Sequence, residues 1–175
     1  MKRIPCEITD VQIFEPKVIE DSRGYFFESF RESWLPDHHF VQDNQSASQK
    51  GTLRGIHYQI THPQGKLVSV VSGEVLDIAV DLRKSSPTFG SSVIKRLSAD
   101  NHRMLWIPPG FGHGFIVLSE HVEFQYKCTN YYDPEDQHII RWNDPDLNID
   151  WGTKSPVLSD RDANGGYFQD ADYFA

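Results

Sequence analysis

Apolar and polar residues alternate along this chain in short runs, and Gly- and Pro-containing turns separate the runs. Residues 55–59 place His57 and Gln59 on one face and Ile56 and Tyr58 on the other, the two-residue period of a strand that buries one face. Comparable runs predict further strands at residues 11–19 (interrupted at Pro16), 25–30, 67–71, 74–82, 91–97, 103–107, 115–118 and 122–128. About nine short strands and no long helix indicate an all-β fold, an antiparallel sandwich or barrel.

The segments between these runs predict little helix. Residues 31–40 form the best helix candidate, but Pro36 limits it to a turn or two. Residues 44–51 are polar and unpatterned, which predicts a loop, and residues 143–175 are expected to wrap the sheets irregularly. A length of 175 residues suits one domain spanning residues 1–175.

Composition restricts the partners and the compartment. A formal net charge of -8 disfavours nucleic acid and anionic membranes, although a local cluster of Arg and Lys can still capture a small anion. Cys6 and Cys128 are the only cysteines, and their separation fits neither a zinc ribbon nor a CxxC pair, so we expect two free thiols. With no apolar leader or membrane-length run, the expected location is the cytoplasm.

Candidate chemistry gathers around His57. Arg54, His57 and Lys66 lie within thirteen residues of one another. A histidine can abstract a proton next to a carbonyl, and a lysine ammonium can hold the enolate oxygen that develops. Inversion of the carbon requires a donor on the opposite face, and Tyr126 is a candidate. The same pattern also fits His57 as a core histidine, Lys66 as a solvated residue at the end of a strand and Tyr126 as a half-buried strand aromatic.

Two spacings resemble the motifs of the cupin superfamily, which are small jelly-roll barrels. They are Gly51-x5-His57-x-Gln59 and Pro108-x-Gly110-x2-His113. Metal-binding cupins carry a second His where this chain has Gln59, so we expect no metal. The resemblance predicts a jelly-roll, cupin-like antiparallel β-barrel. Asp77 alternates with apolar residues and is expected either to orient a histidine or to bond to the backbone.

A more specific resemblance covers residues 5–162. The chain is similar to dTDP-4-dehydrorhamnose 3,5-epimerases in motifs that occur in order and with near-family spacing. They are RGYFFES (residues 23–29), FVQDN (40–44), LRGIHYQ (53–59), QGKLV (64–68), GEV (73–75), WIP (106–108), GHGF (112–115), WNDP (142–145) and LSDRD (158–162).

This resemblance implies an enzyme without metal or cofactor that acts on a thymidine diphosphate 4-keto-6-deoxyhexose. By position, His57 is the general base and Asp162 is its partner in a dyad. Lys66 lies near the C4 oxygen, and Tyr126 returns a proton from the other face. The expected reaction is epimerisation at C3 and C5 of dTDP-4-dehydro-6-deoxy-D-glucose.

The resemblance also implies the substrate contacts and a homodimer that exchanges N-terminal strands. The implied substrate-binding residues are Arg23, Phe26, Glu28, Gln42, Asn44, Arg54, His113, Tyr131 and Arg161. Of these, Phe26 and Tyr131 would flank the thymine, while Arg23, Phe26 and Glu28 would serve the site of the second copy. The chain departs from the family pattern at Pro109, at Gly112 and in residues 135–138.

Three other functions fit parts of the same pattern. A single-centre epimerase of a secondary-metabolite pathway would carry the same side chains. A non-catalytic cupin that binds a nucleotide sugar would most simply lack the base. A metal-dependent cupin oxygenase or isomerase would lose its activity with a chelator.

Overall fold

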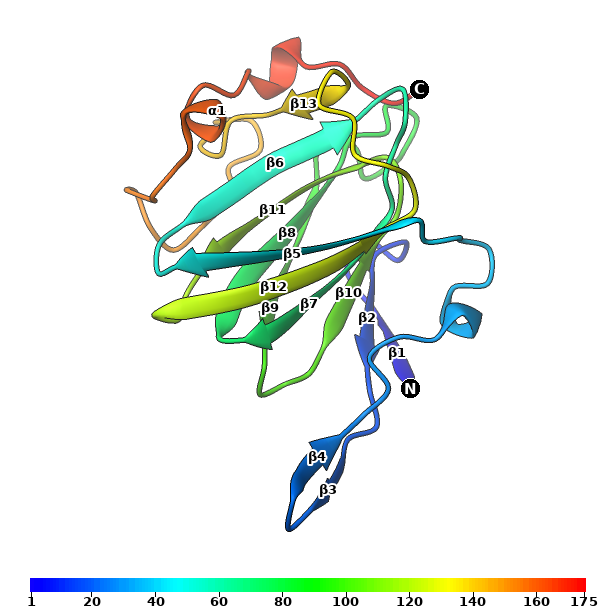
Figure 1. Ribbon diagram of the computed structural model, residues 1–175. Coiled ribbons are helices and arrows are strands. Elements are labelled where there is room, and N and C mark those ends of the chain that lie inside the picture. Colours follow the sequence, from blue (N-terminus) through cyan, green and yellow to red (C-terminus); the bar gives the residue numbers. More distant parts are fainter.

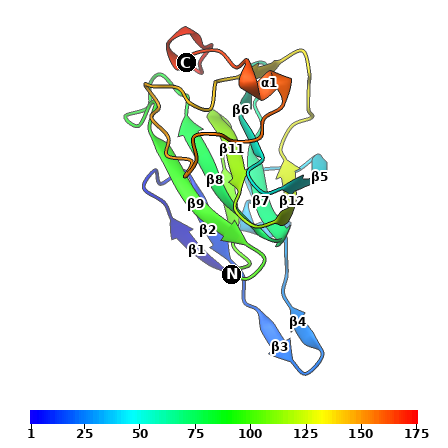
Figure 2. The ribbon, with the colours of Figure 1, turned by 90° about the vertical axis from the view of Figure 1, so that its left-hand side faces the viewer.

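Two antiparallel sheets face each other and enclose the largest apolar cluster of the protein (Figures 1 and 2). The structure is a computed structural model that describes residues 1–175. The six-stranded sheet has the order β1 (Lys2–Pro5), β2 (Gln12–Glu15), β10 (Met104–Ile107), β7 (Lys66–Ser72), β12 (His121–Cys128), β5 (Gln42–Gln49). The five-stranded sheet has the order β13 (Gln137–Ile139), β6 (Leu53–Gln59), β11 (Phe111–Val117), β8 (Glu74–Asp81), β9 (Ser92–Ser98).

The predicted all-β, antiparallel fold class is confirmed. Every pairing between named strands is antiparallel, and helix is limited to α1 (Asp160–Ala163) and the 3₁₀ turns η1 (Glu32–Trp34) and η2 (Phe168–Asp170). The closed jelly-roll barrel expected from the cupin resemblance is not formed, because the two sheets keep separate hydrogen-bond ladders and do not close into one barrel. The site described below lies where they part.

The alternation along the strands determines which side of the sheet each side chain faces. On β8, Val75 and Ala79 join the cluster between the sheets, and Asp77 lies in the same alternating register. Ile78 and Val80 point the other way, into a second cluster that the C-terminal segment covers. This division is the one predicted from the sequence for residues 74–82.

One local prediction was wrong, and another was confirmed. Residues 44–51 were expected to form a loop, but residues 42–49 form strand β5, which pairs with β12 along its whole length. The alternating inner positions of β5 carry Gln42, Asn44, Ser46 and Ser48, so the strand has no apolar alternation to detect. The helix candidate at residues 31–40 is only the turn η1, in agreement with the limit set by Pro36.

An irregularity at Gly55 aligns two functional side chains. His113 pairs with His57 and Phe115 with Arg54, so β6 carries one more residue than β11 over this stretch. In a regular strand, residues three apart face opposite sides, but this β-bulge brings Arg54 and His57 to the same cavity. A Cβ on Gly55 would lie 2.4 Å from the Cα of Gly114, so this close approach requires glycine.

The C-terminal segment covers the outer face of the five-stranded sheet. Trp151 and Leu147 pack on Leu53 and Ile56, and Phe174 closes the same cluster. In Figure 1 the orange and red segment lies above β6 and β13, and α1 lies beside β6. None of the helices is both long and apolar enough to span a membrane.

A hairpin of β3 (Ile19–Asp21) and β4 (Gly24–Phe26) projects from the two sheets (Figures 1 and 2). Its base is held by Tyr25 and Phe27, whose rings lie 4.7 and 4.8 Å from the ring of His102. Phe26 alternates to the other side and is 66% exposed. The hairpin therefore presents an aromatic side chain that its own chain does not cover.

Candidate active site

A cavity of about 520 Å³ opens between the two sheets beneath the C-terminal segment. It is lined by eight of the residues that the sequence singled out, from both sheets and from α1. These residues are Gln42, Asn44, Arg54, His57, Lys66, Tyr126, Arg161 and Asp162. The fold thus brings all four predicted catalytic side chains to one cavity.

His57 and Asp162 form a hydrogen-bonded dyad. The Nε2 atom of His57 lies 2.5 Å from Oδ1 of Asp162, although the two residues are 105 positions apart. Ser159 caps α1 and donates through Oγ to Oδ2 of Asp162 at 2.7 Å, and the Gly55 N–H donates to Oδ1 at 3.4 Å. These donors hold the carboxylate in place. With Nε2 engaged, Nδ1 is the ring atom of His57 left to accept a proton.

Burial and charge decide the protonation of the dyad. Burial lowers the pKa of His57, and the hydrogen bond and charge of Asp162 oppose this effect. Burial opposes ionisation of Asp162, but the hydrogen bonds from His57 and Ser159 outweigh it and lower the pKa of this carboxyl. At neutral pH the dyad is therefore a neutral imidazole beside a carboxylate, which is the state of a general base.

Lys66 and Tyr126 come from neighbouring strands of the opposite sheet. Burial lowers the pKa of the Lys66 ammonium, while Cys128 and Asp77 act to raise it. Burial raises the pKa of Tyr126, and Cys128 reinforces the shift while Arg54 opposes it. The phenol therefore keeps its proton at neutral pH and can donate it. The base His57 therefore lies on the five-stranded sheet, and the acid Tyr126 lies on the six-stranded sheet.

A second His–Asp pair lies beside the first. Nε2 of His113 is 3.0 Å from Oδ2 of Asp77, and both side chains are buried. Asp77 therefore orients a histidine, one of the two roles expected for it. Because His113 pairs with His57 across β6 and β11, the two dyads occupy adjacent positions of the same sheet. Burial raises the pKa of Asp77, and the charge and hydrogen bond of His113 oppose the rise.

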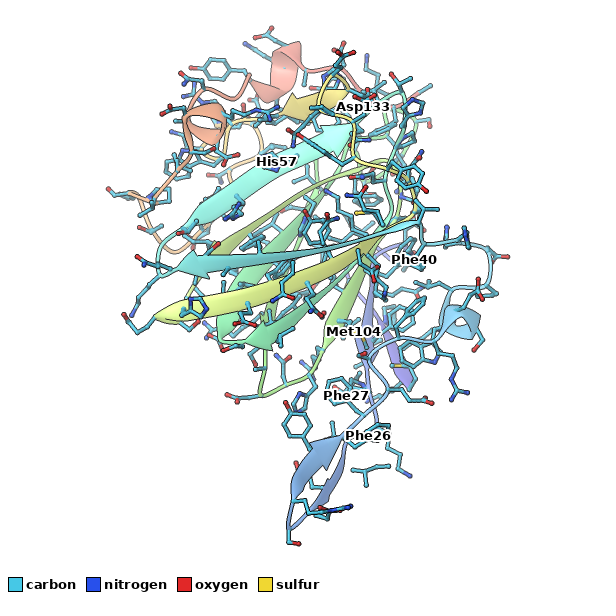
Figure 3. All side chains as sticks on the ribbon, in the orientation of Figure 1. Phe26, Phe27, Phe40, His57, Met104 and Asp133 are labelled. Carbon is cyan, nitrogen blue, oxygen red and sulfur yellow. The ribbon has the colours of Figure 1, made fainter.

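Five predicted binding residues lie outside the lining of this cavity. Arg23 and Phe26 lie on the projecting hairpin and Glu28 follows it; Figure 3 shows Phe26 far from His57. Arg23 is paired with Asp21 and Glu28 with Arg31. His113 is buried against Asp77 and does not line the cavity, and Tyr131 is exposed.

The lining also contains residues that the sequence did not single out. Tyr132, rather than Tyr131, lines the cavity, together with Gln64 and Gln137. The N–H of Tyr132 donates to Oε1 of Gln42 at 2.9 Å, and its hydroxyl donates to Oε1 of Gln137 at 2.9 Å. The sequence does not distinguish Tyr131 from Tyr132, because the irregular loop that carries them has no alternating pattern. Only the contacts in the folded structure distinguish the two tyrosines.

The position of Gln59 differs from that of a metal ligand. No three His, Cys, Asp or Glu side chains come together in an arrangement able to hold a metal ion. The amide of Gln59, at the position where metal-binding cupins carry a histidine, bonds to the backbone of His62, Tyr131 and Asp133. The two cysteines are free and buried, as predicted.

Comparison with known proteins agrees with this geometry. A family model described as dTDP-4-dehydrorhamnose 3,5-epimerase matches residues 5–170. The chain belongs to the dTDP-4-dehydrorhamnose 3,5-epimerase family. A dTDP-4-dehydrorhamnose 3,5-epimerase of Shigella flexneri is 54% identical over 180 residues, which cover 99% of each chain. The family resemblance predicted from the motifs is confirmed.

Two solved structures of similar proteins carry bound nucleotide sugars. The dTDP-6-deoxy-D-glucose-3,5-epimerase from Legionella pneumophila, in complex with dTDP-4-keto-L-rhamnose, is 50% identical, with a TM-score of 0.94 over 98% of this chain and 94% of that one. A 3'-monoepimerase from Streptomyces bikiniensis, in complex with dTDP-quinovose, is 35% identical, with a TM-score of 0.87 over 94% of this chain and 87% of that one. Single-centre and double epimerases thus share this fold.

Substitution of Asp162 by asparagine is expected to lower kcat by about 10²-fold, because an amide no longer fixes the tautomer of His57 or stabilises the imidazolium. Asp162 also raises the pKa of His57, so its loss should move the rising limb of the pH–rate profile to lower pH. In the unsubstituted epimerase that limb is expected below about pH 6.5, the ordinary value for histidine. Initial rates between pH 5 and 9 measure both effects.

Asp160→Asn on the same helical turn is the matched control, since Asp160 makes no contact with His57. It should retain the kcat and the pH profile of the original protein. A normal kcat in Asp162→Asn would show that the dyad contributes nothing to the reaction.

Proposed function

We propose that this protein epimerises C3 and C5 of dTDP-4-dehydro-6-deoxy-D-glucose and gives dTDP-4-dehydro-L-rhamnose. It is an isomerase of the dTDP-L-rhamnose pathway. The observation that carries the proposal is the His57–Asp162 dyad, which faces a cavity whose other wall carries Tyr126 and Lys66. The full-length similarity to 3,5-epimerases supports the same activity.

The chemical step follows from the two walls of the cavity. Nδ1 of His57 removes the proton from a carbon next to the C4 ketone, and the C–H electron pair moves into an enolate whose oxygen the Lys66 ammonium stabilises. Tyr126 then donates its phenolic proton to the opposite face of that carbon, and the ketone reforms. His57 and Tyr126 return to their starting states by exchange with water. A second round at the other carbon completes the reaction.

The nucleotide is held at the polar rim of the cavity. Arg54 and Arg161 supply two guanidinium groups for the diphosphate, since the fork of donors matches phosphate oxygens. Gln42 and Asn44 present amides from β5, and His113 supports the floor through Asp77. For the aromatic side chain beside the thymine we assign Tyr132, because it lines the cavity and Tyr131 does not.

The projecting hairpin supports a homodimer. Phe26 and Arg23 lie on a hairpin that extends away from its own cavity, and Phe26 is exposed. In our proposal residues 1–175 act as one domain, and the hairpin of each copy brings Arg23, Phe26 and Glu28 to the site of the other. The cytoplasm is the proposed location, which suits two free buried thiols.

The stereochemistry of the product tests the proposed function. Purified protein is incubated with dTDP-4-dehydro-6-deoxy-D-glucose, and the sugar protons of the product are assigned by NMR. Inversion at both C3 and C5 is expected, with the same rate when a chelator is present. Inversion at one centre would identify a single-centre epimerase, and binding without conversion would identify a nucleotide-sugar-binding cupin. Loss of activity with the chelator would identify a metal-dependent enzyme.

Replacing Arg54 by alanine should weaken substrate binding more than it slows the chemistry. Arg54 is held by Ser48, whose Oγ accepts from its Nε at 3.2 Å, so the guanidinium is already oriented toward the cavity. Loss of a charged hydrogen-bonding group of this kind should raise KM by about 10- to 100-fold. The control is Arg96→Ala, which removes an exposed surface arginine paired with Glu74. An unchanged KM in Arg54→Ala would exclude Arg54 from the diphosphate site.

A further inference from the structure

Gln59 joins two loops at one end of the cavity. Its side chain is 3% exposed. Its Nε2 donates to the carbonyls of His62 at 2.8 Å and Tyr131 at 3.2 Å, and its Oε1 accepts from the N–H of Asp133 at 3.1 Å. Figure 3 shows Asp133 beside the end of β6, the strand that carries His57. Both donors and one acceptor site of the amide are thus used to tie residues 60–65 to residues 129–136.

Asp136 makes the reciprocal connection. It belongs to the second loop and accepts from the backbone N–H groups of Ile60, Thr61 and His62 at 3.2, 2.9 and 2.8 Å. Its side chain is buried. Disruption of a buried carboxylate that accepts from three N–H groups costs free energy, because each lost hydrogen bond leaves a desolvated polar group without a partner. Gln59 and Asp136 therefore form an interlock in which each loop is held by a side chain of the other segment.

The interlock fixes the position of Tyr132. This residue lies between Tyr131 and Asp133, whose backbone groups both bond to Gln59. Its ring lines the cavity, and its hydroxyl bonds to Gln137. The amide of Gln59 has its donors engaged by the backbone, so its contribution to a ligand passes through the loop that it holds.

We propose that Gln59 and Asp136 are positioning residues that hold Tyr132 as the stacking platform for the nucleobase. The inference rests on the proposed nucleotide-sugar site, since it assigns the interlock to one part of that substrate. An aromatic ring held at a fixed position loses little freedom on binding, and stacking of a base on such a ring favours binding. Loosening the loop should therefore weaken binding of the nucleotide and leave proton transfer at His57 largely intact.

Two variants open the interlock from opposite sides. Gln59→Ala removes all three side-chain hydrogen bonds, and Asp136→Asn cannot accept from all three N–H donors. Both should raise KM for the 4-keto sugar and Kd for thymidine diphosphate by about five- to tenfold, which corresponds to the lower end of the contribution of base stacking. The kcat should stay within about twofold. The matched control is Gln125→Ala, because Gln125 is an exposed strand glutamine that bonds to Gln45. It should change neither constant.

A double-mutant cycle separates positioning from a general loss of stability. If Gln59 acts through Tyr132, Gln59→Ala in a Tyr132→Ala background should raise Kd by less than about twofold beyond Tyr132→Ala alone. Calorimetric binding of thymidine diphosphate provides Kd, and circular dichroism confirms that each variant is folded. Should Gln59→Ala fail to fold, Asp136→Asn in the same two backgrounds completes the cycle.

The outcomes for the interlock and for the proposed function differ. Additive effects of Gln59→Ala and Tyr132→Ala would overturn the positioning role, as would a normal Kd in both interlock variants or in Tyr132→Ala. Thymidine diphosphate binding needs no turnover. A protein that binds it, shows the coupling and yet inverts no stereocentre would therefore refute the epimerase function alone.

Discussion

Replacing His57 by alanine is expected to lower kcat by about 10³-fold, because the substitution removes the group that takes the proton. The imidazole is held by Asp162 through Nε2, which leaves Nδ1 toward the cavity, and burial keeps it neutral by lowering its pKa. Exchange of the substrate protons with solvent should fall by the same factor. Both rates are followed by NMR.

The control for this substitution is His121→Ala, which removes an exposed histidine at the start of β12 and should retain full activity. Thermal unfolding of both variants shows whether the fold is intact. If folded His57→Ala exchanges the substrate protons as fast as the unsubstituted protein, His57 is not the base.

Tyr126→Phe is expected to separate proton removal from inversion. The phenylalanine ring fills the same space but cannot donate, while the base on the opposite sheet remains intact. Inversion should therefore slow by about 10²- to 10³-fold. Exchange with solvent should slow less, because the imidazolium of His57 can return a proton to the face from which it came. The ratio of exchange to inversion, measured by NMR in deuterated water, reports this uncoupling.

The control keeps the same chemistry at another position. Tyr25→Phe removes a hydroxyl from an exposed residue of the projecting hairpin and should change neither rate. Equal losses of exchange and inversion in Tyr126→Phe would show that this tyrosine does not act as the donor after proton abstraction.

Alternation in the sequence predicted much of the sheet structure, because most strands bury one apolar face. It placed His57 on the face of β6 opposite Ile56 and Tyr58, and the structure agrees, since Ile56 and Tyr58 pack in the outer apolar cluster and His57 lines the cavity. It missed β5 because a cavity for a polar ligand needs polar side chains on the inner face, and this removes the apolar period. The segment that was predicted to be a loop is therefore a strand that forms one wall of the site.

Tertiary contacts account for the other differences. No spacing links His57 to Asp162, because α1 reaches β6 only after the chain has crossed both sheets, and the pairing was expected from the family resemblance alone. Arg54 and His57 are three residues apart, and a regular strand would separate them; the bulge at Gly55 brings both to the cavity. The choice between Tyr131 and Tyr132 likewise depends on Gln59, whose role is visible only in the folded chain.

Incorporation of solvent deuterium at the two epimerised carbons tests the central claim most directly. The protein is incubated in deuterated water with dTDP-4-dehydro-6-deoxy-D-glucose. The labelled carbons of the product are assigned by NMR, and the number of incorporated deuterium atoms is measured by mass spectrometry. Acid–base epimerisation at both centres predicts deuterium at C3 and at C5, and its rate should fall with His57→Ala. Inverted product without solvent deuterium would contradict proton abstraction by His57, and label at only one carbon would contradict double epimerisation.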